Sequence, residues 1–362
     1  MRILLKKIYS FLVKLIFNSI YGKLKIADKS FFKENIKILR IKLFSFSHKE
    51  YQIFLANKVR VYSDKSENLA YIKDNYLLPE ISLQLSKNYL ISIENNSVLK
   101  TGTKKLIQKK FSGNILSLVQ GVSAIDNYGH WMLDILPKLC ISEKILNLNE
   151  FDRIYLPNIK RGFQIDSLKY FNINPKKYID GSELNHIYAE KLTIPQHPYW
   201  ETNAYQMDTV ANIDPDIINI LRTKFLKNIK NSNKEKLFID RSDSKYFHSQ
   251  IENIEELYEF LKKNNFKILK LSQITFEEQV SLFQNAKIVV GAHGAGLCNL
   301  IFCNPNTKVI EFSNKEFKCE VFKNISKINN LDYYKLISEN EVPKDRINPD
   351  IKLSINKLSK LI

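Results

Sequence analysis

Glycine and proline are scarce in this chain of 362 residues, with only ten of each. Fibrous proteins and chains dominated by flexible linkers are rich in these residues, so both classes are excluded. The sequence also has no internal repeat. Hydrophobic residues make up 44% of the chain and aromatic residues 12%, which argues against disorder and is enough to build cores. A chain of this length is expected to divide into two domains.

Cysteine is rarer still. The chain has four, at Cys140, Cys298, Cys303 and Cys319. None belongs to a C-x-x-C pair and no histidine lies at zinc-finger spacing, so a zinc site is not expected. We expect the four side chains to be buried as small apolar residues, in a protein of a reducing compartment such as the cytoplasm.

Long hydrophobic runs are also missing. Residues 1–25 are mostly apolar, but polar residues interrupt each apolar run before it reaches the roughly 18 residues that a bilayer span needs. Lys14 breaks the apolar region and no small-residue cleavage site follows, so a signal peptide is not expected. The polar residues share one narrow helical face: Lys7, Ser10, Lys14, Asn18 and Lys25. This pattern predicts a basic amphipathic helix in a membrane interface, or an ordinary helix packed on the protein.

Positive charge is what the chain has in excess. The 55 lysine and arginine residues against 38 acidic ones give a net charge of +17. A basic surface attracts anionic membranes, nucleic acids and phosphorylated substrates. Lysine, isoleucine and asparagine are all abundant, so part of the charge reflects the nucleotide composition of the gene. Because no nucleic-acid recognition motif accompanies the charge, nucleic acid is not an expected partner.

The first half of the chain predicts an α/β domain with an added β layer. Short β-like runs separated by turn residues occupy residues 50–120. Helical patterns follow at about 130–146 and 163–170, with strands at 153–156 and 191–194.

The second half alternates strands and helices more clearly. Strands are predicted at 236–240, 266–271, 287–290 and 307–312, and helices at 253–263, from Thr275 onward and at 294–300. Asn253 is expected to cap the first helix, and Thr275 with Glu278 forms a capping box for the second. Four strands alternating with three helices predict a parallel, doubly wound sheet. The expected divisions are a helix at 1–25, domains at 26–214 and 215–335, and a C-terminal tail at 336–362.

The sharpest motif follows the strand at 287–290. Its residues include Gly291, His293, Gly294, Ala295, Gly296 and Leu297. Ligands of open α/β sheets bind at the carboxyl ends of strands, and a helix N-terminus offers N–H groups to an anion. Glycines let a diphosphate approach the backbone, and His293 can donate to a phosphate oxygen. Alternatively, the small residues only permit tight packing of strand and helix.

Two charged residues follow the same logic. Glu311 lies on the next strand, where its carboxylate could accept two ribose hydroxyls or simply face solvent. Arg241 follows the strand at 236–240, where a guanidinium could neutralise a departing diphosphate or lie on the surface.

A second cluster lies in the first half of the chain. His130 and Asp134 are four residues apart and share a helical face, as a general base and its partner would, or as a helix-surface hydrogen bond. Asp214 and Asp216 could offer two carboxylates to a metal, but they precede a helical run, so a helix start explains them better.

Together, these residues resemble glycosyltransferase family 61, the group with domain of unknown function 563, and in particular its bacterial capsular or surface-polysaccharide members. The family also includes plant xylosyl- and arabinosyltransferases. The motifs that carry the resemblance are the run Asn-Tyr-Gly-His-Trp-Met-Leu-Asp-Ile-Leu-Pro at 127–137, Arg-Ser-Asp at 241–243, Gly-Ala-His-Gly-Ala-Gly-Leu at 291–297, and Glu311. Their order and spacing match the family over roughly 115–315. One position departs from it, because Phe247-His248 stands where members often carry a second basic pair.

The resemblance implies a GT-B-like fold, in which two Rossmann-like domains face a cleft, here with extra β structure in the N-terminal half. It implies an inverting enzyme that uses a nucleotide sugar, often a UDP-sugar, and needs no metal or other cofactor. The domain at 215–335 would bind the donor through the loop at 291–297, Arg241 and Glu311. The domain at 26–214 would serve the acceptor, with either Asp134 or His130 as the base.

The expected acceptor is a glycan or lipid-linked glycan of the capsule or lipopolysaccharide type. The N-terminal helix would then hold the enzyme on the inner face of the plasma membrane. A rival interpretation is a non-catalytic nucleotide-binding protein that docks on membranes. A dinucleotide oxidoreductase is less favoured, because the loop lacks the G-x-G-x-x-G fingerprint at the first strand of its domain.

Overall fold

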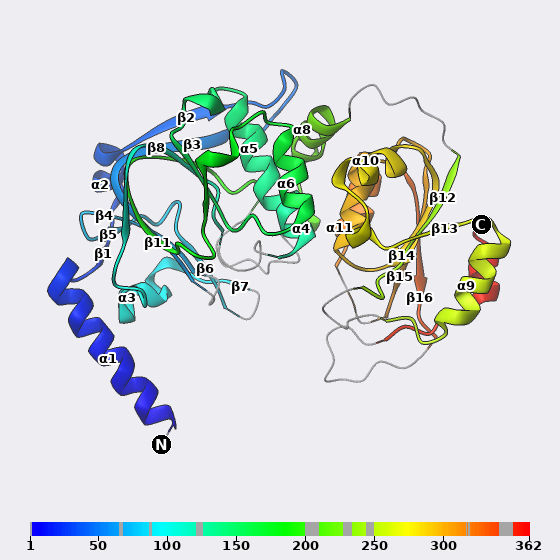
Figure 1. The fold of residues 1–362 in the computed structure, drawn as a ribbon, viewed down its shortest axis with the longest axis horizontal. Helices are drawn as coiled ribbons and strands as arrows, with labels where there is room; N and C mark the ends of the chain where they lie inside the picture. The colour runs from blue at the N-terminus through cyan, green and yellow to red at the C-terminus, as the bar shows by residue number, and fades with distance from the viewer. Residues whose placement is uncertain are drawn as a thin grey trace. The chain divides into compact units, whose positions relative to one another are not determined.

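The structure is a computed structural model that describes residues 2–64, 68–86, 89–120, 126–199, 210–226, 234–243, 250–315, 317, 319–339 and 350–362, with only the backbone for residues 2–7. The chain divides into two compact units, shown in Figure 1. Unit 1 comprises Met1–Arg161 and Phe171–Thr209, and unit 2 comprises Gly162–Tyr170 and Val210–Ile362.

Unit 1 is built on a mixed sheet. Its strands are β1 (Lys25–Ile26), β2 (Ile36–Ile41), β3 (Tyr51–Asp64), β4 (Asn68–Lys73), β5 (Tyr76–Leu77), β6 (Leu83–Ser86), β7 (Tyr89–Leu90), β8 (Lys109–Ser117), β9 (Arg153–Leu156), β10 (Tyr178–Asp180) and β11 (His186–Pro195). The four strands β11-β8-β9-β10 are parallel neighbours, whereas β11 pairs antiparallel with β3. Only this four-strand part therefore resembles the expected Rossmann-like domain, and the rest is the added β structure.

The helices of unit 1 are short apart from the first. They are α1 (Arg2–Tyr21), α2 (Lys29–Asn35), α3 (Ser97–Thr101), α4 (Tyr128–His130) and α5 (Leu136–Glu143), with a π-helical turn η3 (Trp131–Ile135) and 3₁₀ turns η1 (Ile93–Asn95), η4 (Leu148–Glu150) and η5 (Pro175–Lys177). Segments α4, η3 and α5 follow one another without a break, so they form one helix that follows β8.

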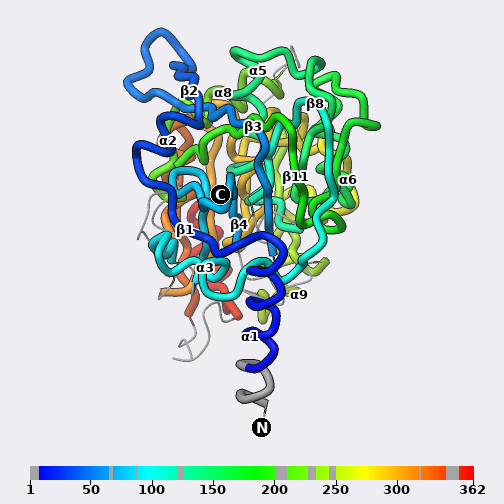
Figure 2. The backbone as a smooth tube through the Cα atoms, turned by 90° about the vertical axis from the view of Figure 1, so that its left-hand side faces the viewer, coloured from blue at the N-terminus to red at the C-terminus, as the bar shows by residue number. Residues whose placement is uncertain are grey.

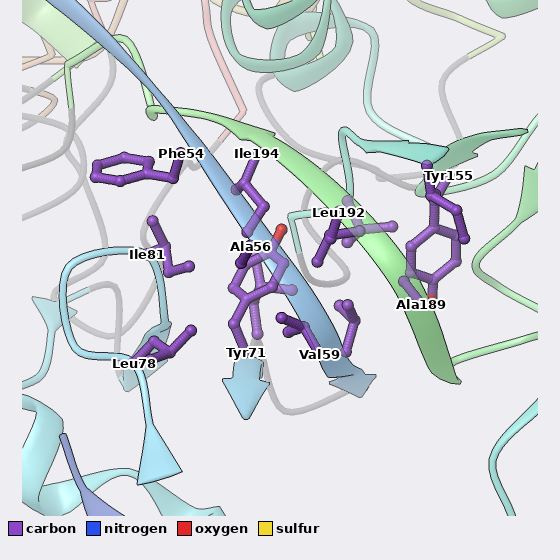
Figure 3. Packing of buried hydrophobic residues seen from close by; sticks show 14 of the residues in the cluster. Phe54, Ala56, Val59, Tyr71, Leu78, Ile81, Tyr155, Ala189, Leu192 and Ile194 are labelled. Carbon is purple, nitrogen blue, oxygen red and sulfur yellow. The ribbon is translucent and has the colours of Figure 1, made fainter. Parts of the chain in front are cut away.

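The core of unit 1 lies against β3 and β11. Phe54, Ala56 and Val59 of β3 belong to this core, as do Leu192 and Ile194 of β11 (Figure 3). The spacing of β3 is irregular between Ala56 and Val59, because Lys58 adopts a positive φ of 57°. Such an irregularity returns the following residues to the same face of the sheet.

Unit 2 contains a five-stranded parallel sheet in the order β13-β12-β14-β15-β16. The strands are β12 (Glu235–Ile239), β13 (Lys267–Leu269), β14 (Ala286–Ala292), β15 (Lys308–Ser313) and β16 (Asp332–Ile337). Taken in chain order, this is the doubly wound arrangement 2-1-3-4-5. The parallel doubly wound sheet expected for the second half is therefore present, with β16 as a fifth strand that the sequence did not predict.

Helices cover both faces of this sheet (Figure 1). The helices of unit 2 are α6 (Gly162–Lys169), α8 (Pro215–Phe225), α9 (Ile254–Lys263), α10 (Phe276–Gln284), α11 (Val321–Ile328) and α12 (Ile355–Ser359), with 3₁₀ turns η6 (Leu271–Gln273) and η7 (Ala295–Phe302). Of these, α6 packs on α10, and α8 packs on η7 and α11. The capping box of Thr275 and Glu278 is confirmed at α10. At α9 Asn253 makes no side-chain cap, because its Oδ1 accepts a hydrogen bond of 3.0 Å from the backbone N–H of Leu353 instead.

The unit borders differ from those expected. Residues Gly162–Tyr170 lie in unit 2, where the Tyr170 ring packs against Phe225 and Phe276 with centroids 5.0 and 6.0 Å away. Residues 336–362 are not a simple tail, because β16 runs to Ile337 and the buried residues Ile351, Leu353 and Leu358 belong to the same core as the sheet.

Two other expectations concern buried or capping side chains. All four cysteines are buried, as predicted. Asp214 is the N-cap of α8, and its carboxylate accepts a hydrogen bond of 2.9 Å from the backbone N–H of Asp216. The interpretation of Asp214 as a helix start is therefore confirmed.

Candidate active site

The strand order of unit 2 places a switch point between β12 and β14. Ile239 pairs with Gly291, so the two strands end side by side and their next residues share the carboxyl edge of the sheet. In open α/β folds, ligands bind in the crevice at this point. Arg241 and His293 both lie just beyond these strand ends, so the structure brings together two of the residues predicted for donor binding.

Arg241 is held against the loop after β14. Its guanidinium donates a hydrogen bond to the backbone carbonyl of His293, and burial lowers its pKa from the usual value. A Cβ at Gly294 would lie 2.7 Å from Cζ of Arg241, so only a glycine allows the guanidinium to approach this closely.

The other glycines of the loop have a different function. A Cβ at Gly291 would lie 3.2 Å from Cβ of Ile239, and one at Gly296 would lie 2.8 Å from Cδ1 of Leu271. Leu297 is buried, whereas His293, Gly294, Ala295 and Gly296 are half-buried. Close packing therefore accounts for Gly291 and Gly296, and the accessible backbone is that of residues 293–296. The turn that follows is 3₁₀ rather than α-helical.

His293 is fixed by a buried carboxylate. Its Nδ1 lies 2.5 Å from Oε1 of Glu311, and the hydroxyl of Tyr333 donates to Oε2 of Glu311 at 2.6 Å. Glu311 is only 1% exposed, and burial raises the pKa of Tyr333. The imidazole also packs on Phe317, with ring centroids 4.2 Å apart. Because both of its oxygens are engaged, Glu311 is placed to orient His293, and the ribose contact expected of it stays a prediction.

The second predicted cluster lies in unit 1, on the helix after β8. Asn127 caps this helix by accepting from the backbone N–H groups of Gly129 and His130. Within η3 the N–H of Leu136 bonds the carbonyl of Trp131, five residues back, as in a π-helix. Pro137 follows directly, and proline has no N–H to continue an α-helical ladder. Single π turns of this kind are frequent at functional sites.

His130 and Asp134 form the pair that their spacing predicts. Nδ1 of His130 lies 2.7 Å from Oδ2 of Asp134. The imidazole is 24% exposed, whereas the carboxylate is completely buried. The alternative of a hydrogen bond on an exposed helix surface is therefore wrong.

Four further residues surround Asp134, and sequence reasoning missed them. Gln120 donates to Oδ2 of Asp134 at 2.6 Å, and Lys138 donates to Oε1 of Gln120, also at 2.6 Å. The hydroxyl of Tyr199 donates to Oδ1 of Asp134, and Nε2 of His197 lies 3.8 Å from the same oxygen. Gln120 follows β8, whereas His197 and Tyr199 follow its parallel neighbour β11, so all three lie at the carboxyl edge of the sheet.

Burial controls the protonation of two of these groups. Burial lowers the pKa of Lys138 to about 8, while the nearby carboxylate of Asp134 raises it in part. Burial also lowers the pKa of His197 well below its usual value, and the charge of Lys138 contributes in the same direction. One of these four residues could have been suspected from the sequence, because Lys138 is a lysine inside the mostly apolar stretch 131–141. Nothing in the sequence distinguishes Gln120, His197 or Tyr199.

The remaining predicted positions are less informative. Asp243, of the Arg-Ser-Asp motif, accepts a hydrogen bond from Ser272. Phe247 and His248 lie outside the described residues.

Comparison with known families decides the relationship. The sequence model of the family Glycosyltransferase 61 matches residues 128–310, which is just over half of the 362 residues. The chain belongs to the glycosyltransferase 61 family. The match includes His130, Asp134 and Lys138 of unit 1 as well as Arg241 and the whole 291–297 loop of unit 2. Glu311 is the first residue beyond it.

Two plant proteins are similar to parts of this glycosyltransferase 61 chain. A β-1,2-xylosyltransferase of Arabidopsis thaliana is 36% identical over 64 residues, or 18% of this chain and 12% of the relative. The β-1,2-xylosyltransferase RCN11 of Oryza sativa subsp. japonica is 28% identical over 131 residues, or 32% of this chain and 25% of the relative. The matched stretches therefore span no more than a quarter of either relative.

Solved structures are more distant. The iron-containing dodecameric glycosyltransferase TibC of enterotoxigenic E. coli H10407 is 11% identical, with a TM-score of 0.27 and 80% of each chain covered. The heptosyltransferase TibC in complex with ADP-D-β-D-heptose is 12% identical, with the same TM-score and 80% and 79% of the two chains covered.

Proposed function

We propose that this protein is an inverting glycosyltransferase that transfers a sugar from a nucleotide donor to a hydroxyl group of a glycan. The observation that carries the proposal is that one family match contains two polar clusters at carboxyl edges of parallel strands. His130 and Asp134 provide a base with a buried partner, and Arg241 and His293 provide a guanidinium and an imidazole that can contact a diphosphate.

His130 is the better candidate for the base. Both oxygens of Asp134 already accept hydrogen bonds, Oδ2 from Gln120 and His130 and Oδ1 from Tyr199. A fully buried carboxylate whose two oxygens are both engaged cannot take a proton from the hydroxyl group of the acceptor glycan. His130 is partly exposed, and its Nε2 lies on the side of the ring opposite Asp134. Asp134 then fixes the tautomer in which Nδ1 carries the proton and Nε2 can accept one.

The proposed reaction is a single displacement. The acceptor oxygen forms a bond to the anomeric carbon while the bond from that carbon to the diphosphate breaks, and the electron pair leaves with the diphosphate. The hydroxyl proton passes to Nε2 of His130. Arg241, His293 and the backbone N–H groups of the 293–296 loop would stabilise the charge that grows on the leaving group. One displacement inverts the anomeric configuration.

The nature of the substrates rests on family relationships. The two relatives named as xylosyltransferases make UDP-xylose the first donor to test, with other UDP-sugars next. A surface glycan of the capsule or lipopolysaccharide type is the proposed acceptor. Because the guanidinium of Arg241 supplies positive charge at the switch point, we propose that no metal ion is needed.

The test combines a donor panel with two matched variants. Nucleotide release and sugar transfer are measured for a set of nucleotide sugars, with and without a chelator. We expect His130→Gln to lower turnover by about 10²–10⁴-fold, the usual contribution of general base catalysis. Donor affinity, measured by calorimetry, should be unchanged. His48→Gln makes the same change at an exposed histidine and should behave as the wild type.

Three outcomes would contradict parts of the proposal. Normal turnover by His130→Gln would exclude this histidine as the base. Loss of activity with the chelator would exclude the metal-independent mechanism. Donor binding without any transfer, in wild type and variant alike, would favour the rival non-catalytic nucleotide-binding protein.

The N-terminal helix supports a second proposal, that the enzyme docks on the inner face of the plasma membrane. The coloured turns of α1 extend away from the sheet of unit 1 (Figure 2), and the described part of the chain contains no helix that could span a bilayer. Phe17 is buried against unit 1, and the guanidinium of Arg60 lies 4.4 Å from the ring of Tyr21. The opposite face exposes apolar side chains: Ile8, Tyr9, Phe11, Leu12, Leu15, Ile16 and Ile20.

Those seven are half of the fourteen large hydrophobic residues that the described part of the chain exposes. They recur three or four positions apart, so they form one continuous stripe. An apolar stripe on a protein of charge +17 is complementary to an anionic lipid surface.

Vesicle binding tests this docking. We expect sedimentation with phosphatidylcholine vesicles that contain phosphatidylglycerol, and weaker sedimentation without it. Phe11 is 60% exposed, and Phe11→Ser should weaken binding about tenfold or more because a large apolar contact is lost. Phe46→Ser, at an equally exposed phenylalanine outside α1, is the control. Equal binding by both variants would exclude α1 as the docking element.

A further inference from the structure

A buried lysine next to the proposed base takes no part in the bond-making and bond-breaking steps of the proposed reaction. Lys138 lies one helical turn after Asp134 and is 4% exposed. Its Nζ donates to Oε1 of Gln120, and Nε2 of Gln120 donates to Oδ2 of Asp134, each at 2.6 Å. The same Oδ2 faces Nδ1 of His130 at 2.7 Å. One amide thus links a buried ammonium to the carboxylate that holds the histidine.

The charges in this cluster oppose one another. An ionised Asp134 on its own would favour the protonated imidazolium form of His130, and a protonated histidine cannot accept a proton. A positive charge on Lys138 offsets that effect, because charges interact strongly where water is excluded.

The other groups around the pair add little charge. His197 faces Oδ1 of Asp134, but burial keeps its pKa well below the usual value, so it is neutral near pH 7. Tyr199 donates to Oδ1 as a neutral hydroxyl. Lys49, from the segment before β3, acts on His197 and donates to the carbonyl of Pro198. Among the described residues, Asp134 and Lys138 are therefore the ones whose contacts place a buried charge beside His130.

We propose that Lys138 is a positioning residue whose buried charge keeps His130 unprotonated, and so able to accept a proton, at neutral pH. This inference rests on the proposed role of His130 as the base. Gln120 couples the two charged groups, because its Oε1 accepts from Lys138 and its Nε2 donates to Asp134.

The experiment compares Lys138→Met with the wild type in two measurements. The first is the pH dependence of turnover, and the second is an NMR titration of the full-length protein with labelled histidine, in which His130→Gln assigns the signal. Removal of the lysine leaves Asp134 uncompensated, so the pKa of His130 should rise by about one unit or more. The acidic limb of the rate profile should move to higher pH by the same amount.

A merely structural role predicts a different result. If Lys138 only filled space, turnover in Lys138→Met would fall equally at every pH, whereas a charge effect lets the rate recover above the shifted limb. Lys144→Met removes an exposed lysine just after the same helix and should leave both measurements unchanged, because water screens its charge. Lys138→Gln replaces Lys138→Met if the latter does not fold.

The outcomes separate this inference from the proposed function. An unchanged titration of His130 in the lysine variant overturns the inference. A shifted titration without a shifted rate profile supports the charge coupling and contradicts His130 as the base.

Discussion

Each unit holds a histidine whose Nδ1 faces a buried carboxylate, His130 with Asp134 and His293 with Glu311. In both pairs the histidine is the more exposed partner. A carboxylate in this position fixes the ring and its tautomer, so each histidine presents Nε2 in a defined direction. The same arrangement serves two proposed tasks: accepting a proton in unit 1 and contacting a diphosphate in unit 2.

The contact between Arg241 and Gly294 is the basis of a first prediction. Gly294→Ala would place a methyl group 2.7 Å from Cζ of Arg241 and push the guanidinium away from the loop. Because a hydrogen bond to a charged group contributes about 1.5–3 kcal/mol, donor affinity should fall roughly ten- to a hundredfold. Calorimetry with a nucleoside diphosphate measures it.

Gly162→Ala is the control for this change, because no atom lies within 4 Å of the added methyl group. Gly294→Ala with unchanged affinity would show that Arg241 does not contact the donor.

Glu311 permits a prediction that separates its two possible roles. Glu311→Gln removes the negative charge beside His293, so binding of inorganic pyrophosphate should weaken about tenfold if the carboxylate acts through His293. If Glu311 instead holds the ribose, the variant should lose affinity for a nucleoside diphosphate but bind pyrophosphate normally. Glu320→Gln, at a more exposed glutamate, should change neither.

The sequence allowed part of each cluster to be predicted, and chain distance explains the rest. His130 and Asp134 are four residues apart on one helix, so periodicity alone joins them. Gln120 and Tyr199 reach Asp134 from the ends of two strands that pair only in the folded chain. Tyr333 reaches Glu311 from β16 in the same way, and no local pattern indicates such partners.

At the scale of elements, the helix after β8 has a feature that propensity alone does not predict. Pro137 lacks an N–H, and its ring conflicts with the carbonyl four residues earlier. The π turn of η3, closed by the N–H of Leu136 on Trp131, precedes it directly. Because a π turn holds one residue more than an α turn, it shifts the residues before it, His130 among them, around the helix relative to α5.

Pro137→Ala tests the importance of this turn. Alanine restores a donor and permits an ordinary α-helix, which would rotate His130 relative to Gln120 and Tyr199. A misplacement of about 1 Å can lower a rate about 10²-fold, so turnover should fall by that order. The melting temperature should fall by only a few degrees, since the change removes two methylene groups of a buried side chain.

Pro175→Ala, at the exposed start of η5, controls for the loss of a proline. Wild-type turnover in Pro137→Ala would show that the π turn has no role in positioning the site.

Elements of the second half were predictable because each strand is short, apolar and bounded by polar residues. The strand β16 was missed because its sequence, Asp-Tyr-Tyr-Lys-Leu-Ile, does not alternate regularly between polar and apolar residues. In unit 1 the register of β3 and β11 decides which residues face the core, and the positive φ of Lys58 breaks the period on which such predictions rely. The mixed sheet there could not be derived from local runs.

At the scale of the whole molecule, the buried histidines make stability depend on pH. Burial lowers the pKa of His186 from 6.5 to about 4, and the ring is 1% exposed. Nδ1 of His186 lies 2.6 Å from the carbonyl of Lys105. On acidification, His186 takes up a proton at a higher pH in the unfolded chain than in the folded chain. Its contribution to the free energy of unfolding is therefore fully present above pH 6.5 and is lost as the pH falls towards 4.

The loss attributable to His186 is about 3 kcal/mol across that window, and His197 adds to it in the same direction. His186→Phe removes the titration and keeps an aromatic ring, while Thr103 still donates to the carbonyl of Lys105. We expect the urea midpoint, followed by tryptophan fluorescence, to fall less between pH 7.5 and pH 5 in this variant than in the wild type or in His48→Phe. Equal pH dependence in all three proteins would mean that His186 becomes protonated without unfolding, and the acid sensitivity would then have to come from other groups, His197 among them.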